Sequence, residues 1–249
     1  MCGNIQFHLS LGASAALLLA SSALLLDAIT FSPNDAQCDA QMSPWTPARA
    51  AIKYDWTMFP PIHFLAHSLY FDSPLPEREA AWRELLPPHP IAIPASHLPN
   101  LNLTTDTGLE PESASEYEFI SSPNTPTSLL ALPEVFVQLH CLNLLRLHGQ
   151  RDEIPNGTYD LPSFQGTEEQ VSQRVEQCLD RLRTTFLCWS DIAPILMYFE
   201  DGDREARRAK KYDFGTRHRC RDFGALRDWT RENGVEGVVM GDAWWGGSL

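Results

Sequence analysis

The chain has 249 residues, 43% of them hydrophobic, and carries a formal net charge of −13 at pH 7. A chain of this length can bury a core of its own, so we expect one globular domain. The negative charge argues against nucleic acid and against anionic lipid as main partners, because both would repel it.

An uncharged apolar segment near the N-terminus predicts a helix that spans a membrane. Residues 9–26 contain no charged side chain, and as a helix they would rise about 27 Å, close to the hydrocarbon thickness of a bilayer. A cleaved signal peptide is the alternative, but no Lys or Arg precedes Arg49 and no clear small-residue cleavage site follows the segment. We therefore expect a short tail at residues 1–8 and an uncleaved transmembrane anchor at residues 9–30.

Two glycosylation sequons favour a luminal position for the rest of the chain. Asn102-Leu-Thr and Asn156-Gly-Thr lie in polar, turn-like surroundings on the C-terminal side of the anchor. Each tripeptide alone is a weak signal, but together they favour a single-pass type II membrane protein of the secretory system. That compartment permits disulfides. An odd number of cysteines follows the anchor, so at least one is free or pairs between chains. These cysteines are Cys38, Cys141, Cys178, Cys188 and Cys220.

The remaining sequence predicts a mainly helical domain with long irregular loops. We expect a linker at residues 31–60 and a luminal domain at residues 61–249. Residues 73–86 have the pattern of a short amphipathic helix, and a short strand is expected near residues 91–93. Residues 94–132 are rich in Pro, Ser, Thr and Asn, which indicates a long surface loop.

The most apolar helix of this domain is expected at residues 133–148. Pro133 suits the first helical turn, where its missing N–H costs nothing, and the apolar side chains leave little polar face. His140 and Cys141, two metal-capable side chains, lie in its middle. A buried polar side chain needs a partner, so His140 is a candidate functional residue.

Two further helices are expected. Thr167-Glu-Glu-Gln170 is a capping box that opens an amphipathic helix, and the apolar stripe of that helix turns Cys178 toward the core. A further apolar segment at residues 187–199 should bend or break at Pro194. A last amphipathic helix should contain residues 223–229.

Short motifs in a fixed order give the chain a family resemblance. They are Gln37-Cys38, Ser43-Pro-Trp-Thr-Pro47, Ala80-Ala-Trp82, Gln138-Leu-His-Cys-Leu-Asn143, Cys178-Leu-Asp180 and His218-Arg-Cys-Arg-Asp-Phe223. In combination, and over nearly the whole chain, they resemble the UstYa-like family of fungal secondary-metabolite (mycotoxin) biosynthesis proteins. The resemblance implies tailoring of a peptide or other natural product, typically by cyclisation, hydroxylation or halogenation, and it implies copper as the cofactor.

The signature of that family is H-x-x-H-C on each of two helices. Residues at these spacings share one helix face, so two packed helices present up to four imidazoles, which suit copper, iron or zinc. Here the first motif is Val137-Gln-Leu-His140-Cys141, and the second is Arg174-Val-Glu-Gln177-Cys178. Three of the four expected histidines are therefore replaced, and only His140 remains.

These replacements change the chemistry that the motifs can support. One imidazole is too few ligands for a catalytic transition metal, which usually takes three or more from the protein. Arg174 adds a fixed positive charge where a ligand of a dication would lie. Arg174 and Gln177 are instead hydrogen-bond donors one helical turn apart, which suits a carboxylate or carbonyl group of a substrate. Copper at these positions is therefore not expected.

The motif cysteines are candidates for a disulfide. The resemblance makes Cys141 and Cys178 a candidate pair between the two helices, and a thiolate pair that binds copper together with His140 is the alternative. Cys188 and Cys220 are the other candidate pair.

Other histidines are candidates for rebuilding a metal site. His63 and His67 would share a helix face, although nearby prolines and apolar residues favour a partly buried apolar segment. His148 lies two helical turns after His140, where the helix dipole at a C-terminus also favours a histidine. His218 is as compatible with a structural role beside a cysteine as with metal ligation.

The sequence supports functions from different classes. In an enzyme, His140 would act as general base or acid, while Arg174 and Gln177 would position a polar group of the substrate. In a non-catalytic partner, the chain would form a hetero-oligomer with an intact relative in the same membrane, which the missing ligands suggest. A membrane glycoprotein with only a structural role is disfavoured by the length of the family resemblance.

Overall fold

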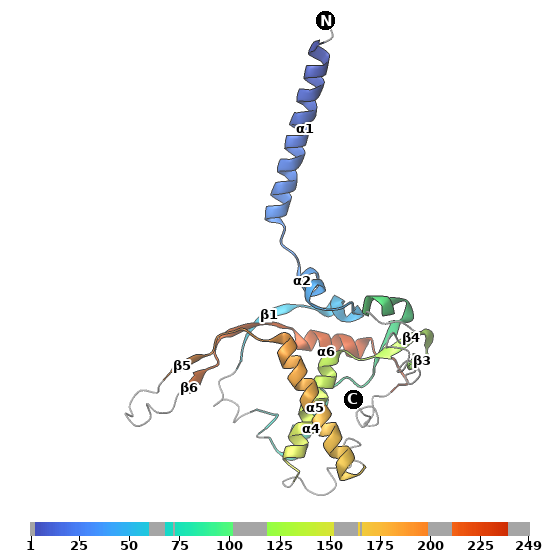
Figure 1. Ribbon diagram of the computed structural model, residues 1–249. Coiled ribbons are helices and arrows are strands. Elements are labelled where there is room, and N and C mark those ends of the chain that lie inside the picture. The colour runs from blue at the N-terminus through green and yellow to red at the C-terminus, as the bar shows by residue number, and fades with distance from the viewer. Residues whose placement is uncertain are drawn as a thin grey trace. The chain divides into compact units, whose positions relative to one another are not determined.

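Helices form most of the structure, as the sequence predicts (Figure 1). The computed structural model describes residues 3–59, 68–71, 73–101, 119–151, 164, 166–198 and 211–238. The chain divides into two compact units, Met1–Met42 and Ser43–Leu249.

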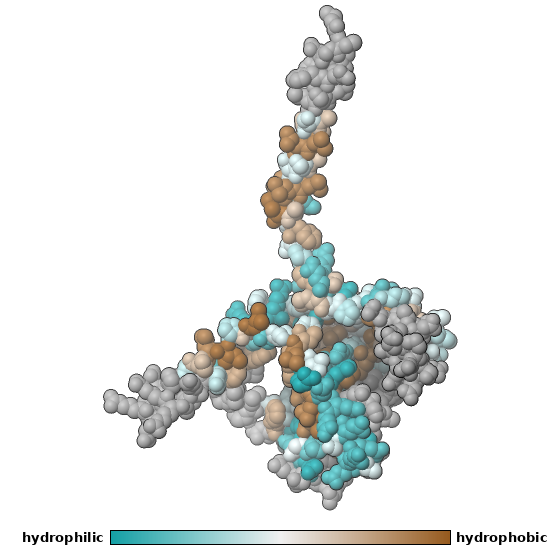
Figure 2. All heavy atoms as spheres, viewed as in Figure 1, coloured by the Kyte–Doolittle hydropathy of each residue, from teal (hydrophilic) through white to brown (hydrophobic). Residues whose placement is uncertain are grey.

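The first unit is dominated by one long helix. α1 (Gly3–Thr30) contains a stretch, Gly12–Thr30, that is long and apolar enough to cross a membrane. Figure 2 shows the hydrophobic side chains along this helix. The expected anchor at residues 9–30 therefore lies in a helix of suitable length and composition, two properties that a signal sequence near the N-terminus shares. A short helix, α2 (Asp35–Met42), completes the unit.

Two helices form the framework of the second unit, as expected. α4 (Glu134–Gly149) follows Pro133 at its N-cap. α5 (Glu168–Trp189) opens with the predicted capping box, in which Thr167 and Gln170 exchange side chain to backbone hydrogen bonds. The buried side chains of α4 are Phe136, His140, Cys141, Leu144 and Leu147.

The strands form small antiparallel sheets. Among the described residues they are β1 (Tyr54–Met58) with β7 (Arg217–Arg221), β2 (Ile91–Pro94) with β4 (Thr125–Ala131) and β3 (Ser121–Ser122), and β5 (Leu196–Tyr198) with β6 (Lys211–Asp213). The pairs β1–β7 and β2–β4 join segments that are far apart in the sequence. Of these strands, the sequence predicted β2.

The structure differs from the sequence expectation where strands pair over long distances. Residues 31–60 were expected as a linker, but β1 pairs with β7, and the compact unit begins at Ser43. Residues 94–132 were expected as a loop, but β4 pairs with β2. In the segment at residues 187–199, α5 ends at Trp189 and β5 follows. Pairing partners distant in the sequence leave no local signal, which explains these differences.

Shorter helices close the core. They are α3 (Leu75–Glu84), the 3₁₀ helices η1 (Pro47–Ala51) and η3 (Ala95–Leu101), and α6 (Phe223–Glu232), which is the last helix predicted from the sequence. The ring of Phe223 packs on that of Phe136 at a centroid distance of 5.9 Å, which attaches α6 to α4. After α6, Gly234 forms a β-bridge with Ile91.

A polar cluster attaches α3 to α4. The guanidinium of Arg146, whose side chain is only 7% exposed, donates two hydrogen bonds of 2.8 Å to the carboxylate of Glu79. It also donates to Asn143 and lies 5.0 Å from the ring centroid of Trp82. A bidentate, nearly buried pair of this kind holds two helices in a fixed orientation.

Replacing Arg146 should therefore destabilise the fold. We expect Arg146→Ala to lower the free energy of unfolding by about 3 kcal/mol, because the carboxylate of Glu79 loses its partner in a half-buried place. Arg183 pairs with Asp180 on the solvent-exposed surface of α5, so Arg183→Ala should cost less than about 1 kcal/mol. Urea denaturation of both variants measures the difference, and equal losses would contradict a special role for the cluster.

Candidate functional site

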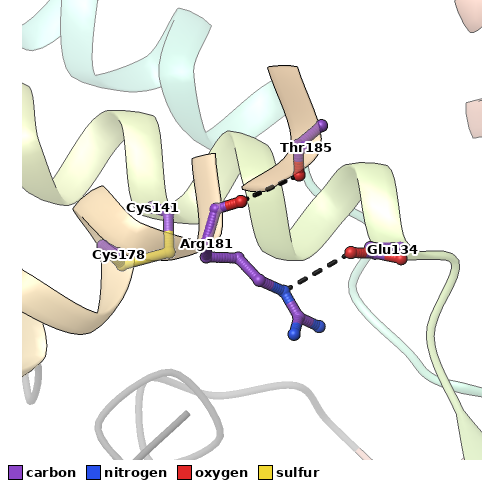
Figure 3. The surroundings of a disulfide bond; sticks show 5 residues. All are labelled: Glu134, Cys141, Cys178, Arg181 and Thr185. Carbon is purple, nitrogen blue, oxygen red and sulfur yellow. Dashed lines mark hydrogen bonds and ion pairs between the residues drawn. A yellow bond between two sulfur atoms is a disulfide. The ribbon is translucent and has the colours of Figure 1, made fainter. Parts of the chain in front are cut away.

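A disulfide joins the two motif helices. The sulfur atoms of Cys141 in α4 and Cys178 in α5 are bonded, and both cysteines are fully buried (Figure 3). Around them lie Leu144, Leu145, Phe164, Val175 and Leu182. The structure therefore contains the first candidate pair as a disulfide, and these cysteines are not a thiolate pair for copper.

The two helices run antiparallel. Glu134, near the start of α4, forms an ion pair of 3.4 Å with Arg181, which follows Cys178 in α5 (Figure 3). The disulfide joins a residue farther along α4 to a residue earlier along α5. From the first contact to the second, the residue number increases in α4 and decreases in α5, as it does for antiparallel helices.

This direction places the two motifs on one side of the helix pair. In each motif the signature residues lie one and four positions before the cysteine, so they occupy the same flank of that cysteine. Consider the plane that contains the axes of both helices. A twofold rotation about a line perpendicular to this plane superimposes one antiparallel helix on the other. This rotation does not move any residue from one side of the plane to the other, so equivalent motif residues lie on the same side. Val137, His140, Arg174 and Gln177 therefore share one side of the pair. Parallel helices would put them on opposite sides.

The four side chains differ in burial. His140 is buried, with 8% of its surface exposed, while Val137, Arg174 and Gln177 are half-buried. The side that carries the motifs therefore places one buried imidazole next to the disulfide, together with an amide and a guanidinium that solvent reaches.

Arg174 extends toward the start of α5. Gly166, just before the capping box, has a φ of 107°, which glycine adopts without strain. A guanidinium nitrogen of Arg174 lies 3.4 Å from the place that a Cβ at this glycine would occupy. The charge of Arg174 thus lies toward the N-terminal end of α5, away from Cys178, while the backbone of Gln177 is adjacent to that cysteine.

The residues at the motif positions do not fit a copper centre. They offer one imidazole, one amide, one guanidinium and one aliphatic side chain, whereas a transition-metal site usually takes three or more ligands from the protein. Among the residues that the structure describes, no three His, Cys, Asp or Glu side chains come together in a way that could hold a metal ion. His63 and His67 lie outside these residues, as do the sequon asparagines Asn102 and Asn156.

The other candidate histidines are held elsewhere. His148 is eight residues after His140 in α4, a rise of about 12 Å, and its Nε2 lies 3.5 Å from Arg151. The Nδ1 of His218 pairs with the carboxylate of Asp191 at 2.9 Å. Neither arrangement brings a second imidazole to His140.

The second candidate disulfide is absent, since Cys188 and Cys220 are free thiols in the structure. Cys188 is exposed on the last turn of α5, while Cys220 is half-buried within β7. Cys38 is free as well.

Sequence reasoning missed a cluster at the end of α5. The ring of His218 stacks on that of Phe59 at a centroid distance of 4.1 Å, and its Nδ1 pairs with the carboxylate of Asp191. Ser190, the C-cap of α5, has a φ of 32° in the left-handed region, and the next residue, Asp191, accepts a hydrogen bond from the backbone N–H of Ala193. Serine followed by aspartate is a common turn signal, and it was available in the sequence.

A comparison with known families identifies the chain. The family model described as "Mycotoxin biosynthesis protein UstYa" matches residues 4–233. The chain belongs to the UstYa family. The resemblance drawn from the short motifs is therefore confirmed.

Relatives of the chain carry two kinds of name, oxidase and transacylase. The UstYa family oxidase phomYc of Diaporthe leptostromiformis is 29% identical over 206 residues, 82% of this chain and 75% of that protein. The UstYa family oxidase phomYc' of the same fungus is 26% identical over 231 residues, 92% of this chain and 78% of that protein. The transacylase cctO of Talaromyces islandicus is 30% identical over 214 residues, 84% of this chain and 66% of that protein. No solved structure matches the chain.

Loss of the disulfide should destabilise the helix pair. The bridge closes a loop with a sequence separation of 37, so Cys141→Ala combined with Cys178→Ala should lower the free energy of unfolding by about 4 kcal/mol. The exposed Cys188 is the matched control, and Cys188→Ala should change the free energy of unfolding by less than about 0.5 kcal/mol. Denaturation under non-reducing conditions measures both, and an unchanged double variant would show that the bridge does not stabilise the fold.

The pair of Asp191 and His218 should make the free energy of unfolding depend on pH in the acidic range. The backbone N–H of Ala193, and secondarily His218, hold the pKa of Asp191 below its ordinary value. A lowered folded-state pKa stabilises the fold above the unfolded pKa, near 4, and this contribution is lost as the pH falls through the folded value. Asp191→Asn should therefore be less stable than wild type near pH 7, and the gap should narrow toward about pH 3. Chemical denaturation of both proteins at the two pH values measures this difference in the free energy of unfolding, and a difference that is the same at both pH values would contradict the linkage.

Proposed function

We propose that the chain tailors a peptide or similar natural product by proton transfer at His140, in an acyl-transfer or cyclisation step. Membership of the UstYa family already connects the chain with fungal secondary metabolism. The observation that carries the proposal is one imidazole, kept at a motif position, buried, and anchored next to a disulfide that joins both motif helices.

The donor set favours this chemistry over a metal-dependent oxidation. An imidazole accepts and donates protons near neutral pH. The amide of Gln177, beside the disulfide on the same side of the helix pair, can donate a hydrogen bond to a carbonyl of the substrate. The guanidinium of Arg174, which extends toward the start of α5, can bind a carboxylate in a more distant part of the substrate. Together they provide a base and oxygen-binding groups, and no step needs electrons to enter or leave.

The reaction class balances without a further reagent. A hydroxyl or amine of the substrate attacks an acyl carbon, and His140 accepts the proton that this group loses. The bond from the acyl carbon to its original oxygen or nitrogen then breaks, and His140 returns the proton to the leaving atom. The name of the relative cctO, a transacylase, supports this reaction class, although the phomYc relatives are named oxidases.

We also propose that the second unit lies in the lumen of the secretory pathway, behind α1 as a type II anchor. A disulfide between Cys141 and Cys178 supports an oxidising compartment. The sequons at Asn102 and Asn156 support the same side of the membrane.

Replacement of His140 tests the function. The gene is expressed in a fungal host together with the neighbouring genes of its biosynthetic cluster, and mass spectrometry follows the product. We expect His140→Ala and His140→Gln to lower product formation by about 10²- to 10⁴-fold. His148→Ala, on the same helix but two turns away, should leave it nearly unchanged.

Two controls decide between the enzyme and the non-catalytic partner. Thermal unfolding of the detergent-purified variants must show that His140→Gln is folded. Normal product from a folded His140→Gln chain would overturn the proposal and favour a partner without chemistry of its own. Copper at one equivalent per purified chain would also contradict it.

A further inference from the structure

One part of the second unit exposes many large apolar side chains. This part, called here the apolar surface, comprises the end of α5, the segment after it, the β5–β6 ribbon and β1. Figure 2 shows the hydrophobic colour on the ribbon and on α5. Its main residues are Trp56, Met58, Phe186, Trp189, Ile192 and Leu196. Ile192 is 95% exposed and Leu196 is 65% exposed.

Polar contacts hold the pieces of the apolar surface together. The hydroxyl of Thr216 donates to the carbonyl of Pro194 at 2.6 Å, which joins the segment before β5 to the chain between β6 and β7. Asp191 pairs with His218 of β7, and the guanidinium of Arg221 lies 4.8 Å from the ring centroid of Trp189. The apolar side chains therefore stand on one connected structure.

The area of the apolar surface matches that of a protein interface. Aromatic side chains have about 150–250 Å² each. With their exposed fractions taken into account, the three aromatic main residues and the exposed aliphatic side chains beside them together offer on the order of 800 Å². The largest apolar patch of a typical monomer covers about 300–600 Å², whereas each partner in a standard interface buries about 800 Å². A surface of this size is unfavourable in water and sufficient for a stable dimer.

The strands favour a protein over lipid as the occupant. All three residues of β5 are exposed, and within the described residues β5 pairs with β6 alone, as β1 does with β7. An isolated two-stranded ribbon is marginal in water, and its edges present backbone N–H and C=O groups that another strand can pair. Hydrocarbon cannot satisfy such groups.

We propose that the apolar surface is the interface of a homodimer, and that a second copy of this chain occupies it. A strand that pairs antiparallel with its own copy obeys twofold symmetry, so the same surface serves both partners. The net charge of −13 on each chain opposes this association only weakly, because salt screens exposed charges beyond about 8 Å. The inference is independent of the reaction proposed for His140.

The mass of the full-length chain in detergent tests the dimer. Size-exclusion chromatography with light scattering, corrected for detergent, should give two copies per particle near 10 µM. Leu196→Glu and Ile192→Glu should each weaken dimerisation by about 100-fold or more, which lowers the mass at this concentration to that of one copy. Leu69→Glu is the matched control, because Leu69 is 62% exposed and lies outside the apolar surface, so this variant should remain a dimer.

Other outcomes would overturn the proposal. A wild-type chain that stays monomeric up to 100 µM has no such dimer, and a blue shift of its tryptophan emission with phosphatidylcholine vesicles, lost in Leu196→Glu, would assign the surface to lipid. Dimers that survive both glutamate substitutions associate through another part of the chain. Circular dichroism of each variant must match wild type, and a misfolded variant is replaced by Leu196→Ser.

Discussion

The covalent link between α4 and α5 is the constraint on which the candidate site depends. It fixes where two antiparallel helices meet, and the direction of the helices then decides that both motifs lie on one side. The partly buried Arg146–Glu79 pair attaches α3 to α4, and the Phe136–Phe223 contact attaches α6 to α4. The position of His140 is thus determined by this framework.

This organisation separates the scaffold of a UstYa protein from its chemistry. This chain contains the cysteines that join the helices, but it has Val137, Arg174 and Gln177 at the three positions where the signature that it resembles would place imidazoles. A site whose shape is set by a disulfide and by helix packing can exchange its side chains without loss of the fold. In the proposed function the same frame would carry proton transfer, whereas the phomYc relatives are named oxidases.

The sequence predicted those parts of the fold that have local causes. The capping box at Thr167 and Gln170 and the apolar run after Pro133 located α5 and α4, since both signals lie within the helices themselves. The strand β4 was missed because its sequence resembles a loop and its partner β2 lies far away in the chain. For the same reason the pairing of Asp191 with His218 was not predicted.

For the candidate site, the motif positions could be predicted and their surroundings could not. The sequence itself places His140 next to Cys141 and Gln177 next to Cys178. The path of the Arg174 side chain toward Gly166 depends on a glycine with positive φ and on the space around it. Such features follow from packing, so only the structure reveals them.

The left-handed conformation of Ser190 sets the exit direction of the chain from α5. A residue with a Cβ is disfavoured there by about 1–2 kcal/mol, so the surrounding contacts must hold it in place. Glycine would relieve that cost, but it would also allow the chain to leave the helix along several paths. The serine thus gives up some stability in return for one defined direction of the chain, and the chain continues from there to β5 and its partner strand β6.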